Sequence, residues 1–79
     1  MKYIIIGLGN FGASLAEKLT AQGNEVFAVD TSKTKVDAFK EKITYTVQLD
    51  ATDELAVAGL PLKETDIVII AIGEDQGAN

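Results

Sequence analysis

Residues 3–15 read YIIIGLGNFGASL, an apolar run that ends on three glycines and passes directly into a helical pattern. Gly7, Gly9 and Gly12 have the spacing G-x-G-x-x-G. Between a buried strand and a helix, the first glycine permits a tight turn, the second lets a phosphate approach the backbone, and the third lets the helix pack closely on the sheet. Glycine turns are common, so this pattern also fits a turn that binds no ligand.

Four short runs rich in isoleucine and valine predict the strands of a sheet. Tyr3–Ile6, Val26–Val29 and Ile67–Ile72 do not alternate with polar residues, which is typical of strands buried on both faces. Ile43–Leu49 alternates and predicts a more exposed outer strand. Its apolar positions are expected on one face: Ile43, Tyr45, Val47 and Leu49.

The first of three helical patterns follows the glycine turn. Phe11, Leu15 and Leu19 form an apolar stripe, and Gly23 is placed to end the helix. Gly12 lies on the same helical face as Ala16, which favours a close approach to the sheet.

Two shorter helices are expected further along the chain. Ser32 can cap the second, whose inward residues are Val36 and Phe39. Thr52 can cap the third, which stops near Gly59.

The resulting order β-α-β-α-β-α-β, with short connections, predicts an α/β fold. We expect part of a Rossmann-like, doubly wound parallel sheet with the strand order 3-2-1-4. A chain of 79 residues makes one domain at most, so residues 1–79 are expected to form a single unit.

Composition narrows the possible functions. The chain has no cysteine and no histidine, so thiol catalysis and the commonest general base are absent, and we predict no catalytic residue and no metal site. The net charge of −5 argues against a nucleic-acid surface. The longest apolar run, Ile67–Ile72, is too short to span a bilayer, and the N-terminal run is too short for a signal peptide. Any link to a membrane is therefore expected to pass through a partner.

Asp30 favours the interpretation of the glycine turn as a nucleotide-binding turn. It ends the next strand about 20 residues further on, where its carboxylate can accept hydrogen bonds from both hydroxyls of an adenosine ribose. The alternative is an N-cap or an Asx turn before the second helix. Thr31, beside it, is a further candidate for nucleotide contact. Lys35 lies one turn into the second helix and can reach a phosphate, or can simply be solvated on a lysine-rich face.

Two other strand ends are candidates for the base-binding side. Asp50, Ala51 and Thr52 follow the third strand and can line an adenine pocket, although Asp50 or Thr52 can equally cap the third helix. The residues Ala71, Ile72 and Gly73 end the fourth strand at the expected switch point.

Four ordered motifs, IIIGLGNFG, VFAVD, LDAT and VIIAIGED, resemble the N-terminal lobe of RCK domains. These regulators of K⁺ conductance, also called TrkA-N or KTN domains, belong to bacterial Ktr and Trk potassium uptake systems. The resemblance covers essentially the whole chain and is greatest to subunits of the KtrA or TrkA type.

The resemblance implies a cytoplasmic, non-enzymatic regulator. Such domains bind NAD(H), ATP or ADP, form homo-oligomers up to rings, and act on a membrane K⁺ transporter or channel subunit, which keeps them at the inner face of the membrane. The family's phosphate loop corresponds to Gly7, Gly9, Asn10, Phe11 and Gly12, with Asp30 on the ribose. Its base-flanking positions correspond to 50–52 and 71–73.

The chain departs from the family pattern in two ways. Asn10 stands where many relatives carry an arginine directed at a terminal phosphate, which weakens the expectation of ATP-over-ADP discrimination and favours NAD(H). The family's lobe also continues beyond the equivalent of residue 79, so we expect this chain to be the N-terminal part of a longer domain, with its fourth strand an open apolar edge that invites pairing.

Two other functions fit the same glycine turn and the same acidic residue. One is the cofactor-binding half of an NAD-dependent dehydrogenase that lacks its catalytic domain. The other is an adenine-nucleotide-binding fold with no partner of its own.

Overall fold

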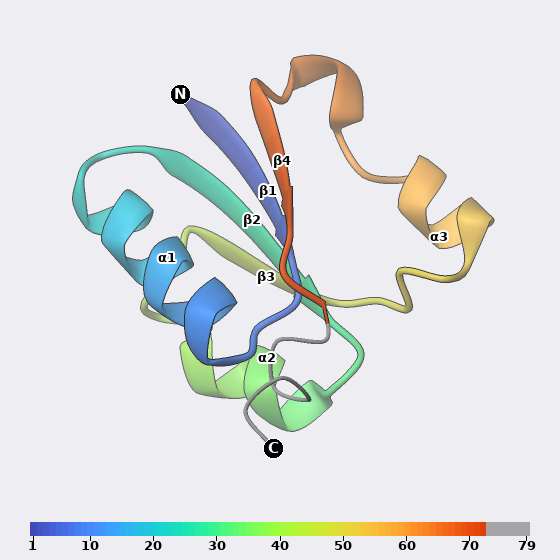
Figure 1. Ribbon diagram of the computed structural model, residues 1–79, viewed down its shortest axis with the longest axis horizontal. Coiled ribbons are helices and arrows are strands. Elements are labelled where there is room, and N and C mark those ends of the chain that lie inside the picture. The colour runs from blue at the N-terminus through green and yellow to red at the C-terminus, as the bar shows by residue number, and fades with distance from the viewer. Residues whose placement is uncertain (73–79) are drawn as a thin grey trace.

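The computed structural model describes residues 1–72, which form one parallel sheet with flanking helices (Figure 1). The strands are β1 (Lys2–Ile6), β2 (Glu25–Asp30), β3 (Tyr45–Gln48) and β4 (Ile67–Ile70). The helices are α1 (Asn10–Ala21), α2 (Lys33–Phe39), α3 (Glu54–Ala58) and the short 3-10 helix η1 (Leu62–Glu64). The strand order β3-β2-β1-β4 and the parallel pairing confirm the predicted fold class and topology.

Helices cover the two faces of the sheet unequally. On one face, α1 and α2 pack against β1 and β2, with Ala16 and Val36 in the same core as Ile5. On the other face, which faces α3 in Figure 1, Ile4 packs in a second core with Leu60. Alternate residues of β1 thus fill opposite cores, as the period of a strand requires. No residue of α3 itself is buried.

The glycine turn brings α1 unusually close to the sheet. A Cβ at position 12 would overlap the carbonyl oxygen of Gly7, so only glycine allows this approach. Gly12, Ala13 and Ala16 are the buried residues of α1. This confirms the predicted packing role of Gly12.

The predicted apolar stripe of α1 is wrong at its first residue. Leu15 and Leu19 pack partly buried against the core, but Phe11 is 58% exposed. The physical reason is that α1 approaches the sheet with its small Gly12–Ala16 face, which leaves Phe11 outside the contact. Gly23 follows the helix as predicted.

The predicted third strand is longer than the observed one. β3 begins at Tyr45, and Ile43 lies in the preceding turn, where its N–H donates to the carbonyl of Phe39 at 3.1 Å. Ile43 is therefore buried with α1 and α2, whereas Val47 and Leu49 pack on the opposite core. The expectation that these three residues share one face is wrong, because the alternation of a strand does not extend into the turn.

β4 is the edge of the described sheet next to β1, as the strand order predicts. Burial on both faces, which the apolar run suggested, is wrong: Val68 is 45% exposed and Ile70 is 71% exposed. Both pair with β1 residues of the second core, but they lie on the edge strand of the described sheet. Among residues 1–72 no strand pairs with the outer edge of β4.

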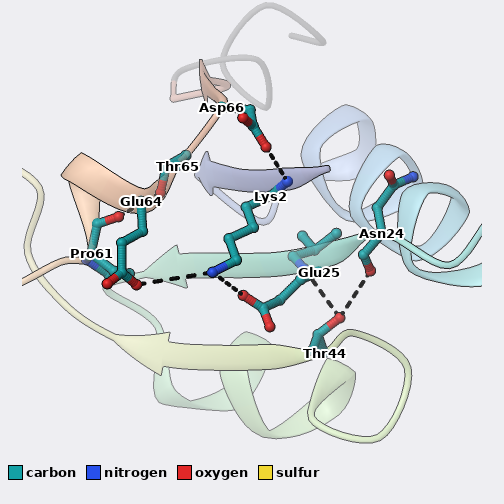
Figure 2. Close-up of polar contacts among 9 residues, drawn as sticks. Lys2, Asn24, Glu25, Thr44, Pro61, Glu64, Thr65 and Asp66 are labelled. Carbon is teal, nitrogen blue, oxygen red and sulfur yellow. Dashed lines mark hydrogen bonds and ion pairs between the residues drawn. The ribbon is translucent and has the colours of Figure 1, made fainter.

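Polar contacts tie the strands together at the end where they begin. Figure 2 shows the Lys2 ammonium between the carboxylates of Glu25, at 3.8 Å, and Glu64, at 4.0 Å. The N–H of Lys2 also donates to the Asp66 carboxylate at 2.8 Å. Exposed ion pairs contribute little to stability, about 0–1 kcal/mol each. These contacts hold η1 and the start of β4 beside β1, at the opposite end of the sheet from the glycine turn.

We predict that Gly12→Ala destabilises the fold by about 3 kcal/mol, at the upper end of the usual cost of overpacking. The added methyl group meets the rigid carbonyl of Gly7 rather than a movable side chain. Urea denaturation followed by circular dichroism measures the change.

Gly59→Ala is the matched control. Gly59 has φ −78°, and the atom nearest to an added Cβ there is the Ala56 carbonyl oxygen at 3.4 Å. Its substitution is expected to change the unfolding free energy by less than about 0.5 kcal/mol. Equal stability of the two variants would show that the close approach of α1 does not constrain the fold.

Candidate functional site

A cleft of about 110 Å³ opens at the carboxyl ends of the strands. Its lining comes from the end of β1 and the glycine turn, the end of β2 and the start of α2, and the segments after β3 and β4. The lining residues are Ile6, Gly7, Gly9, Val29, Asp30, Thr31, Lys35, Leu49, Ala51, Ala71 and Ile72. Since β1 lies between β2 and β4, the cleft is at the switch point where open parallel sheets bind their ligands.

The glycine turn forms one wall of the cleft. Gly7 has φ +111°, and its N–H donates to the carbonyl of Val29 at 2.8 Å. Any side chain at Gly7 would also press on the Ala71 backbone, because a Cβ there would be 2.9 Å from the Ala71 oxygen. Gly9 is the N-cap of α1, so the start of this twelve-residue helix borders the cleft. The positive end of a helix dipole favours an anion at such a position.

Asp30 connects the two turns at the centre of the site. Its Oδ2 accepts a hydrogen bond from the N–H of Leu8, and its Oδ1 accepts one from the N–H of Ser32, both at 2.8 Å. The second contact is the Asx turn considered as an alternative role. The N-cap alternative is wrong, since Ser32 caps α2 by accepting from the N–H of Lys35. Each carboxylate oxygen has a further lone pair, so these bonds leave acceptor capacity for ribose hydroxyls.

The charge of the cleft is nearly balanced. Within residues 1–72, Asp30 and Lys35 are the charged residues that line it, and Thr31 adds a hydroxyl. The remainder of the lining is backbone, small residues and apolar side chains. A cleft of this composition can hold an anionic group through backbone N–H donors although the chain as a whole carries −5.

The segment after β3 contributes to the cleft mainly through Ala51 and Leu49. Asp50 and Thr52 lie outside the lining and are exposed, where the Asp50 carboxylate accepts from the Thr52 hydroxyl at 2.6 Å and from the Thr52 N–H at 2.9 Å. The cap of α3 is Asp53, whose carboxylate accepts from the next turn. The predicted cap at Asp50 or Thr52 is therefore wrong, because these two residues bond to each other.

The hydrogen bonds from Thr52 lower the pKa of Asp50, and the side-chain hydroxyl is the larger cause. Because this pKa is lowered in the folded chain, the contact stabilises the fold at pH values above the ordinary pKa of an aspartate. This contribution is lost as the pH falls through the lowered pKa.

Eight of the predicted site residues line the cleft together: Gly7, Gly9, Asp30, Thr31, Lys35, Ala51, Ala71 and Ile72. Asn10, Phe11 and Gly12 belong to the first turn of α1 and lie outside the lining, as do Asp50 and Thr52. Gly73 lies outside the described residues.

Sequence reasoning missed four residues of the site. Ile6, Val29 and Leu49 line the cleft, and the backbone N–H of Leu8 binds Asp30. The three apolar residues are at or beside strand ends, and parallel register could have placed them. The Leu8 contact carries no side-chain signal, because the donor is a backbone group that every residue except proline has.

The glycine turn, the acidic strand end and the cleft at the switch point define a Rossmann-like domain of the nucleotide-binding type. The sequence model of the TrkA-N domain matches residues 3–79. The chain belongs to the TrkA-N domain family.

Two similar proteins come from Bacillus subtilis. The chain is 39% identical over 74 residues to Ktr system potassium uptake protein C, covering 94% of this chain and 34% of that protein. It is 39% identical over 72 residues to Ktr system potassium uptake protein A, covering 91% of this chain and 32% of that protein. The chain thus spans about a third of the length of these curated relatives.

A shorter similarity connects the chain to an enzyme. It is 49% identical over 41 residues to a GDP-mannose 6-dehydrogenase of Pseudomonas putida, which covers 52% of this chain and 9% of that protein.

We predict that Thr52→Val raises the pKa of Asp50 toward the ordinary aspartate range, because the variant lacks the hydroxyl donor. Titration of the Asp50 carboxyl by NMR measures the shift. Thr65→Val is the control, since the Thr65 hydroxyl donates to the Pro61 carbonyl and not to a carboxylate. An unchanged Asp50 pKa in Thr52→Val would contradict the assigned cause.

Proposed function

We propose that this chain is the nucleotide-binding part of a regulatory subunit of a K⁺ uptake system. It senses an adenine nucleotide, NAD(H) or ATP/ADP, and transmits its state to a membrane K⁺ transporter. The observation that carries this proposal is the Asp30 carboxylate, placed beside the glycine turn in a cleft at the switch point. The names of the Ktr relatives support the link to potassium uptake.

In the proposed complex, the adenosine ribose binds Asp30 and the phosphates lie against the glycine turn. Gly9 lets the phosphates approach the start of α1, and Lys35 lies in the same cleft as a cation for them. Ala51, Ala71 and Ile72 flank the base with small or apolar surface. Thr31 contacts the ribose side of the ligand.

Asn10 governs the choice of nucleotide in this proposal. It begins α1 directly after Gly9, and its side chain has no charge. An amide gives a terminal phosphate less electrostatic attraction than an arginine does. We therefore propose that the chain discriminates weakly between ATP and ADP and also accepts NAD(H).

The proposed partners are a membrane K⁺ transporter or channel subunit and further copies of this chain. Among residues 1–72, the longest helix is α1, and none is long and apolar enough to cross a bilayer. We propose a cytoplasmic protein held at the inner membrane face by its partner. We also propose that residues 1–79 are the N-terminal part of a longer RCK domain.

The second candidate function is the cofactor half of an NAD-dependent dehydrogenase, which the similarity to GDP-mannose 6-dehydrogenase favours. That similarity covers about half of this chain, whereas the Ktr similarities cover more than nine tenths. Within the described lining, Asp30 and Lys35 are the residues whose side chains could act as a general acid or base. In the proposed complex both bind the ligand instead. We therefore propose a non-enzymatic role.

We predict that at least one of the nucleotides ADP, ATP, NAD⁺ and NADH binds the chain at sub-millimolar concentration. Asp30→Ala is expected to weaken that binding by about tenfold or more, since it removes charge-assisted hydrogen bonds to the ribose. Isothermal titration calorimetry measures the affinities. Asp37→Ala, which removes an exposed carboxylate from α2, is the control and should bind like wild type.

Two results would overturn the site assignment: no binding of any of these nucleotides, or equal binding by Asp30→Ala and the unmodified chain. The sequence encoded after residue 79 distinguishes the regulator hypothesis from the dehydrogenase hypothesis. A second ligand-binding lobe supports the regulator, and a catalytic domain supports the dehydrogenase.

A further inference from the structure

The turn of residues 30–32 holds the carboxylate that would bind the ribose. Asp30 is fixed to β3 by its backbone, because its carbonyl accepts from the N–H of Leu49 at 2.9 Å. Its side chain is fixed by the N–H groups of Leu8 and Ser32. The direction in which the Ser32 N–H points therefore helps to set the direction of the carboxylate.

Gln48, the last residue of β3, contacts this turn from outside the cleft. Its Nε2 donates to the carbonyl oxygen of Thr31 at 3.2 Å. Val47 and Leu49 pack on the second core, so the side chain of Gln48 points to the opposite face of the sheet, where α2 lies. Gln48 does not line the cleft itself.

The two contacts meet on one rigid group. The carbonyl of Thr31 and the N–H of Ser32 belong to the same peptide unit, which is planar and places its oxygen and hydrogen on opposite sides. Gln48 donates a hydrogen bond to the oxygen of this unit, and the Asp30 carboxylate accepts one from its N–H. A hydrogen bond to the carbonyl also polarises the N–H and strengthens its bond to the carboxylate.

We propose that Gln48 is a positioning residue for ribose recognition. Through the Thr31–Ser32 peptide it orients Asp30 toward nucleotides that have free 2′- and 3′-hydroxyls. This inference rests on the proposed function. It adds a residue on the edge strand that acts on the ligand only through the turn.

The test compares ADP, the part shared by ATP and NAD(H), with 2′-deoxy-ADP. In calorimetry, the unmodified chain is expected to bind ADP about tenfold more tightly than 2′-deoxy-ADP, which is the effect of one hydrogen bond to a charged group. This ratio of the two affinities is the quantity compared between variants. Gln48→Glu keeps the size of the side chain but replaces the donor by an acceptor, and is expected to reduce this ratio to about threefold or less. Its added charge weakens the binding of both ligands alike, so a change in the ratio reports the orientation of Asp30.

Three further comparisons make the test specific. Gln22→Glu introduces the same chemical change on an exposed residue at the end of α1 and should keep the tenfold ratio. Gln48→Lys keeps a donor and should retain most of the ratio. In an Asp30→Asn background, Gln48→Glu should change the ratio no further, because the two residues act in one chain of contacts.

The outcomes are distinguishable. A ratio in Gln48→Glu equal to that of the unmodified chain, with binding otherwise intact, overturns the positioning role and leaves the proposed function standing. Equal binding of ADP and 2′-deoxy-ADP by the unmodified chain overturns both the ribose contact and this inference. If Gln48→Glu does not fold, Gln48→Leu replaces it, and the comparison with Gln48→Lys decides the question in the same way.

Discussion

The contact between α1 and the carbonyl of Gly7 is the constraint on which the rest of the described structure depends. Because residue 12 has no Cβ, the helix begins directly against the end of β1. This closeness brings the first turn of α1 beside Ala71, directly after β4. The cleft, the switch point and the anion-favouring end of the helix all meet here. A bulkier residue at position 12 would separate them.

The site is built mainly from backbone groups that side chains hold in place. Asp30 joins the glycine turn to the start of α2, and Gln48 reaches the same turn from the edge strand. In the proposed complex, uncharged backbone N–H groups at the start of α1 favour phosphates although the chain carries a net charge of −5. The polar contacts of Lys2 lie at the other end of the sheet and serve its assembly (Figure 2).

The two faces of the sheet differ in how well they are filled. α1 and α2 cover the first face with continuous packing, whereas the short α3 covers only part of the second. Val68 and Ile70 are consequently the most exposed residues of β4. Their apolar character follows from the β4 sequence, but their exposure follows from the position of β4 at the edge of the described sheet.

The sequence by itself determined the fold class, the strand order and the position of the cleft. Strand and helix patterns alternate along the chain, and the glycine spacing and Asp30 mark the edge where parallel strands end. These signals are local, so each can be interpreted without knowing what lies nearby in space. The similarity to RCK domains added the expectation of a K⁺ uptake regulator, which the TrkA-N match supports at the level of the family.

Only the tertiary structure decided how individual side chains are used. Phe11 is exposed because α1 approaches through glycine and alanine, and Ile43 turns to the helical face because it precedes its strand. Asp30 accepts from Leu8, 22 residues away along the chain, and Gln48 donates to Thr31, 17 residues away. Both contacts end on backbone atoms, which every residue carries. No pattern of side chains can encode such a partner, so it appears only when the folded chain brings the two segments together.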